Sequence, residues 1–63
     1  MYNQESYVVH MKVNLRGERD VYVHVKARTV SRAKRIAQKI IEHAGYEILQ
    51  IGEVCTESSW KAA

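Results

Sequence analysis

The chain has 63 residues and a mass of 7.3 kDa, which allows one small domain and excludes a multi-domain enzyme. With 46% hydrophobic and 27% charged residues it is typical of a globular chain, and no apolar run reaches the roughly 18 residues that cross a membrane. The net charge of +3 is uneven: residues 1–41 hold nine Lys/Arg against three Asp/Glu, and residues 42–63 hold one against four. This asymmetry favours an oriented contact with a charged partner.

We expect one domain, 1–63, with an N-terminal extension at 1–6 and a C-terminal tail at 56–63. A core this thin usually needs support, and the single Cys55 cannot form an internal disulfide, so a homodimer or a bound partner is expected. The start of the chain lacks the basic and apolar segments of a secretory signal, and a lone thiol suits a reducing compartment. Both features predict a cytoplasmic protein.

Alternating apolar residues predict two strands in succession. The first begins at Tyr7, and the second covers 21–27. The face expected to pack inward carries Tyr7, Val9, Met11, Val13 and Leu15, then Val21, Val23, Val25 and Ala27. The open face carries Val8, His10, Lys12 and Asn14, then Tyr22, His24 and Lys26.

The two strands should form an antiparallel hairpin in which residues of one face oppose each other. The favoured register sets Met11 against Val25 and Arg16 against Asp20, an ion pair beside a 17–19 loop. A two-residue turn at 17–18 would mismatch the faces unless a bulge repaired it.

A helix follows, because apolar residues recur with a period of 3.6. Thr29 is the expected N-cap, and Gly45 suits the left-handed position after the last turn. The apolar stripe consists of Val30, Ala33, Ile36, Ala37, Ile40, Ile41 and Ala44.

A third strand is expected over 46–54, where neither alternation is clean, so either a bulge or burial on both sides is predicted. A strand after the helix crossover can lie antiparallel beside the first strand. The predicted fold is therefore α+β: a small β-β-α-β domain with a three-stranded antiparallel sheet, in the order second, first, third strand, and one amphipathic helix on one face. Two open edges would remain, which favours pairing.

The main candidate site is the polar face of the helix, because residues 28–39 hold five cations and no acid. Cations in the first turn oppose the helix dipole, at a cost of about 0.3–1 kcal/mol each, and here lack acidic partners one turn away. That cost favours a binding role, with a merely solubilising face as the alternative. The residues are Arg28, Arg32, Lys34, Arg35 and Lys39.

A basic face can bind either phosphates or an acidic protein surface, and composition does not separate these partners. Base stacking needs exposed aromatics, and only Tyr22 qualifies, so sequence-specific reading of single strands is disfavoured. The open sheet face is a secondary candidate, with Lys12, Tyr22, His24 and Lys26.

No enzyme activity, cofactor or metal is expected. The sequence has no paired-carboxylate spacing, no glycine-rich phosphate loop and no nucleophile with an identifiable base. His10 and His24 are diagonal neighbours but too few for a zinc site, and Glu53 and Glu57 disfavour a reactive Cys55 thiolate. Trp60 is interpreted either as a lid packed over the core or as an interface anchor, with packing preferred.

The run from Ala27 to Lys39, A-x-T-x-S-x-A-K-R-I-A-x-K, resembles small phage anti-CRISPR proteins of the type I-F surveillance-complex inhibitors. The match covers roughly a third of the chain. In that family more strand follows the helix, including an aromatic-rich hairpin that this sequence lacks. The resemblance implies binding to a bacterial CRISPR-Cas surveillance complex in the host cytoplasm, interference with target binding, and non-specific DNA association in some members. It would make Lys34, Arg35 and Lys39 the contact residues, with Arg28 and Arg32 beside them.

The leading hypothesis is thus a phage-encoded inhibitor that docks its basic helix onto a nucleic-acid-handling complex. One alternative is a dimeric DNA- or RNA-binding module that presents two basic helices. Another is a structural subunit joined through sheet edges.

Overall fold

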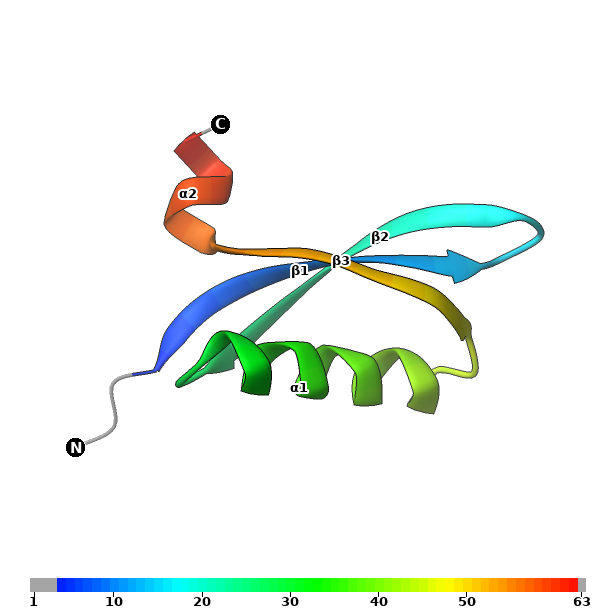
Figure 1. Cartoon of the computed structure of the whole chain (residues 1–63), viewed down its shortest axis with the longest axis horizontal. Coiled ribbons are helices and arrows are strands. Elements are labelled where there is room, and N and C mark those ends of the chain that lie inside the picture. The colour runs from blue at the N-terminus through cyan, green and yellow to red at the C-terminus, as the bar shows by residue number, and fades with distance from the viewer. Residues whose placement is uncertain (1–3, 63) are drawn as a thin grey trace.

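The computed structural model describes residues 4–62 and has the element order β1 (Glu5–Asn14), β2 (Glu18–Ala27), α1 (Val30–His43), β3 (Glu47–Thr56) and α2 (Glu57–Ala62). The sheet is antiparallel with the strand order β2-β1-β3, so the predicted α+β fold and topology are confirmed. Figure 1 shows α1 beneath the sheet and α2 on the opposite side. Within these residues, neither helix has the length and apolar character of a membrane span.

Both ends of the chain differ from expectation. Residues 5 and 6 belong to β1 rather than to an extension, while residues 1–3 lie outside the described part. Of the expected tail at 56–63, Thr56 is the last residue of β3 and Glu57–Ala62 form the short helix α2, while residue 63 lies outside the described part. Thr56 caps this helix, because its Oγ1 accepts a hydrogen bond of 3.2 Å from the Ser59 N–H.

The hydrophobic core lies between α1 and the sheet. Alternation places one face of β1 and β2 against α1, as predicted. Val8 lies on the other face and is still only 2% exposed. Val8 lines a hollow together with Trp60 of α2. The short helix therefore buries part of the sheet face that was predicted to be exposed. The buried core residues are Tyr7, Val9, Met11, Val13, Val25, Ala27, Ala33, Ala37 and Ile41.

The hairpin register predicted from sequence is wrong. Met11 pairs with Val21, and the strands end on the pair Asn14 and Glu18. The loop is therefore 15–17, where Arg16 and Gly17 have positive φ angles of 56° and 110°. Because the register moves, Asp20 no longer opposes Arg16, and Leu15 is 46% exposed in the loop rather than in the core.

The limits of α1 are as predicted. The Thr29 Oγ1 accepts a hydrogen bond of 3.2 Å from the Arg32 N–H, which makes Thr29 the N-cap. At the other end Gly45 has a φ of 90°. The N–H groups of Gly45 and Tyr46 donate to the carbonyls of Glu42 and Ile41, which closes the helix in a Schellman motif.

The third strand contains two register shifts, so the bulge expected from its mixed pattern is confirmed. Leu49 is an extra residue opposite β1, and Gly52 and Glu53 together oppose the single residue His10. Each bulge adds one residue between inward-facing positions. The core side of β3 therefore repeats every three residues, at Ile48, Ile51 and Val54.

Candidate functional site

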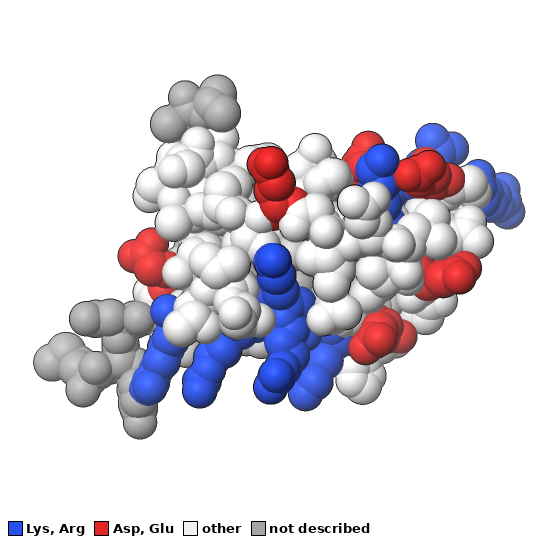
Figure 2. Space-filling model, viewed as in Figure 1, with Lys and Arg blue, Asp and Glu red and all other residues white. Residues whose placement is uncertain are grey.

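The basic face of α1 consists of Arg32, Arg35 and Lys39. These residues follow one another at spacings of three and four, which places them on one stripe of a helix. The buried residues of α1, Ala33 and Ala37 among them, lie on the opposite side against the sheet. Figure 2 shows Lys and Arg side chains in a row below the sheet, where α1 lies, projecting away from the sheet. The structure therefore places these three cations on the exposed side of the helix, as its apolar period predicts.

The two remaining predicted cations flank the basic face rather than extend it. Lys34 is exposed, but at about 100° per residue it lies on the side of the helix near Ile41. Arg28 is exposed and precedes the N-cap. The contact set implied by the resemblance, Lys34, Arg35 and Lys39, therefore spans two sides of α1.

The charges of the helix are not neutralised locally. In the part of the chain that the structure describes, Arg32, Lys34, Arg35 and Lys39 form no ion pair. The first turn of α1 contains no acidic residue, so Arg32 adds to the positive end of the helix dipole. The surface is thus arranged to attract an anion.

Two isoleucines of α1 are more exposed than the apolar stripe predicts. Ile36 is 38% exposed and Ile40 is 47% exposed, because the sheet covers only the centre of the stripe. Their helical positions lie between the buried side and the basic face. The exposed surface of α1 therefore combines cations with an apolar margin.

The open sheet face carries a row of rings that the sequence reasoning only partly identified. His10 stacks on Tyr22 with ring centroids 5.1 Å apart, and Trp60 meets His24 edge-on at 5.2 Å. Tyr22 and Trp60 are 6.3 Å apart, which joins the two pairs into one aromatic cluster of His10, Tyr22, His24 and Trp60. Trp60 thus packs, as preferred, but on the face opposite the core and not over it.

A signal for this placement was present in the sequence. Thr56 followed by Glu57 and Lys61 combines an N-cap with an i,i+4 pair, whose charged atoms are 3.6 Å apart in α2. One helical turn after Thr56 is enough to return Trp60 to the sheet. These signals predict the short helix α2, whereas the aromatic cluster was not predicted.

The two lysines of the secondary candidate face differ. The Lys12 ammonium lies 3.1 Å from a Glu18 carboxylate oxygen, and this hydrogen bond raises the pKa of Lys12 above 10.5. Its charge is therefore already compensated. Lys26 is exposed and forms no ion pair within residues 4–62. The face is not uniformly basic, because it also carries the acidic residue Asp20. The Asp20 Oδ1 lies 2.8 Å from the His10 Nε2.

A hollow of about 220 Å³ adjoins the aromatic cluster. It is bounded by apolar and aromatic side chains, with Glu53 as its one carboxylate and Cys55 as its half-buried thiol. The volume suits one small group rather than a polymer. Its lining residues are Val8, His10, Tyr22, Glu53, Cys55 and Trp60.

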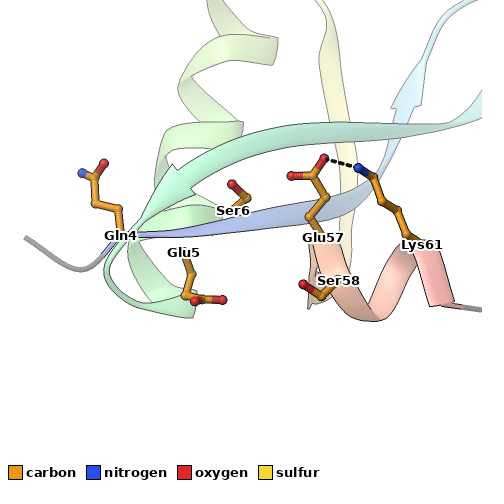
Figure 3. Close-up of a pocket in the computed structure, with 6 residues that line it drawn as sticks. All are labelled: Gln4, Glu5, Ser6, Glu57, Ser58 and Lys61. Atoms are coloured by element: carbon orange, nitrogen blue, oxygen red, sulfur yellow. Dashed lines mark ion pairs between the residues drawn. The ribbon is translucent and has the colours of Figure 1, made fainter.

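A second hollow, of about 320 Å³, lies between the start of β1 and α2. Figure 3 shows that its polar side chains come from both segments and that Glu57 and Lys61 are joined to each other. Among the described residues, no group of three or more His, Cys, Asp or Glu side chains could hold a metal ion.

No protein-family model, curated protein or solved structure matches the chain.

Proposed function

We propose that this chain is a small, non-enzymatic binding protein that docks the basic face of α1 onto an anionic surface of a bacterial nucleic-acid-handling complex and blocks nucleic-acid binding there. One observation carries the proposal: Arg32, Arg35 and Lys39 form an exposed stripe with no ion pair in residues 4–62. Cations in the first turn of a helix lower its stability, and no acidic residue in the first turn of α1 offsets this effect. A partner that supplies the opposite charge explains why such cations are present.

A protein target is favoured by the apolar margin of the same surface. Ile36 and Ile40 lie beside the basic face and gain nothing from a phosphate backbone, whereas a protein interface buries apolar side chains next to charged ones. The resemblance of residues 27–39 to type I-F inhibitors names the target class as a CRISPR-Cas surveillance complex. On this proposal the chain acts in the host cytoplasm as a phage product.

The test is a DNA-binding assay with a purified surveillance complex and increasing amounts of the chain. The wild-type chain should block target DNA binding, and a variant with Arg32, Arg35 and Lys39 each changed to Glu should not. A matched control changes Arg16, Arg19 and Lys61 to Glu, which gives the same net charge away from α1 and should still inhibit. Circular dichroism checks that both variants fold. Full inhibition by the α1 variant would overturn the proposal.

Direct binding of nucleic acid is the second candidate, favoured by the absence of any acid between positions 28 and 39. Each phosphate contact releases counterions, so affinity should fall steeply as salt rises. A fluorescence-anisotropy titration with DNA and RNA duplexes and single strands, repeated at several salt concentrations, measures this slope. Absence of binding at low salt would eliminate this candidate and leave the protein-directed one.

A further inference from the structure

The two edges of the sheet are not equivalent. β3 contains two bulges, which interrupt the regular order of backbone groups along a strand. β2 pairs with β1 over ten successive residues without a shift, so its outer edge is long and regular. Within residues 4–62 no strand pairs with that edge. Regular unpaired edges are the ones that accept a further strand.

The side chains of β2 on the open sheet face change sign along the strand. Glu18 and Asp20 come before Tyr22, and His24 and Lys26 come after it. A second β2 strand laid antiparallel reverses this order, so its basic half faces the acidic half of the first. A parallel arrangement would place like charges together. The pattern is therefore complementary to a second copy of itself, in one orientation only.

We propose that two copies of this chain pair through β2, antiparallel and centred on Val23, to form one six-stranded sheet. In this register Asp20 faces Lys26 of the second copy, and Tyr22 faces its His24. On the core side Val21 faces Val25 of the second copy, and β-branched pairs of this kind stabilise antiparallel strands. Lys26 is available for the contact, because it forms no ion pair within residues 4–62. Asp20 contacts the His10 Nε2 through its Oδ1, which leaves its Oδ2 for the second copy.

The neighbouring register is worse. Centring the pair on Tyr22 would set Arg19 against Val25 of the second copy on the side that faces the core, and would pair Asp20 with a histidine instead of a lysine. The Val23 register sets Arg19 against Ala27 at the end of the strand. The core side is then continuous valine across the two-fold axis.

This pairing has a geometric consequence. Residues of equal parity oppose each other, so both copies turn the same face in the same direction. The two α1 helices then lie on one side of the six-stranded sheet, and the basic faces of two chains are displayed together. The dimer follows from β2 alone and does not depend on what α1 binds.

Sedimentation equilibrium of the full chain tests the pairing. The wild type should dimerise, and Lys26→Glu should weaken dimerisation by about tenfold or more, since two attractive pairs become repulsive. Asp20→Lys should do the same, and the double variant should recover most of the affinity because reversed charges again face each other. Glu53→Lys on β3 is the matched control and should have no effect. A strict monomer at millimolar concentration would overturn the proposal.

Cross-linking fixes the register. In a Cys55→Ser background, Val23→Cys places two thiols across the axis and should give a disulfide-linked dimer on mild oxidation. Gln50→Cys on the β3 edge should give none. Efficient cross-linking at position 50 with none at position 23, or a dimer insensitive to Lys26→Glu, would place the contact elsewhere and refute pairing through β2.

Discussion

Gly52 lies against the imidazole of His10 with no room for a side chain between them. A Cβ at position 52 would meet the Nδ1 atom of the His10 ring. The same Cβ would lie 3.1 Å from the His10 Cγ and 3.1 Å from the His10 carbonyl oxygen. The ring is also stacked on Tyr22 and bound through Nε2 to Asp20. The second bulge of β3 thus brings backbone to the open sheet face and fixes one member of the aromatic cluster.

Gly52→Ala should therefore lower the free energy of unfolding by about 1–3 kcal/mol, the usual cost of inserting a methyl group into a filled space. Adding His10→Ala should recover part of the loss, because the ring is removed while the nearby carbonyl remains. Urea denaturation measures both effects, with Gln50→Ala on the same strand as an exposed control. Strictly additive losses would show that the two residues do not interact.

A cation in the first turn of α1 lowers the stability of the helix, and this effect gives a second prediction. Arg32 occupies the third helical position after the N-cap Thr29, where Glu would complete a capping box and oppose the dipole favourably. Arg32→Glu should raise the free energy of unfolding by about 0.3–1 kcal/mol in urea titrations while it weakens inhibition. A gain in stability accompanied by unchanged inhibition would mean that Arg32 makes no contact with the target.

Arg35→Glu is the matched control for that experiment. It removes a charge from the same stripe but lies beyond the first turn, where capping does not act. It should weaken inhibition comparably and raise the free energy of unfolding by only about 0.2–0.5 kcal/mol, because the new carboxylate faces Lys39 one turn later but completes no capping box. The pair of variants separates the effect of the substituted charge on the helix from its effect on the partner.

The elements and their order were predictable because each rests on local signals. The alternation of β1, the 3.6-residue stripe of α1 and the caps at Thr29 and Gly45 are all written in consecutive residues. The basic face was predictable for the same reason. A stripe of cations needs only a correct helix phase, and burial of Ala33 and Ala37 confirms that phase.

The register of the hairpin was not predictable by the same reasoning. Parity rejects registers that differ by one residue, but registers that differ by two or four keep every face correct. The loop decided the outcome, through the positive φ angles of Arg16 and Gly17. The local signals after Thr56 predict only the short helix α2, whereas the contacts of Trp60 with rings of β2 are tertiary packing that no local period reports.

The covering role of Trp60 gives a third prediction. Trp60 and Cys55 line the same hollow, and Cys55 is half-buried. Trp60→Ala should accelerate the reaction of the Cys55 thiol with a disulfide reagent severalfold, because the ring no longer shields that hollow. Trp60→Phe should retain most of the protection. Equal reaction rates in all three proteins would show that α2 does not cover this part of the sheet.

The Lys12–Glu18 pair predicts a pH dependence. The hydrogen bond that the Lys12 ammonium donates to Glu18 raises the pKa of Lys12 in the folded chain above 10.5, so the pair stabilises the fold below pH 10.5. That contribution is lost as the pH rises through the raised value, because the lysine then loses its charge.

Urea titrations between pH 9 and pH 12 measure this loss. The free energy of unfolding of Lys12→Met should decline less steeply than that of the wild type at the alkaline end. Lys12→Arg should also decline less steeply while remaining more stable than Lys12→Met, since a guanidinium keeps its charge there. Lys34→Met, on an exposed lysine of α1 without an ion pair in residues 4–62, should follow the wild-type profile, and the same profile for Lys12→Met would contradict the assignment.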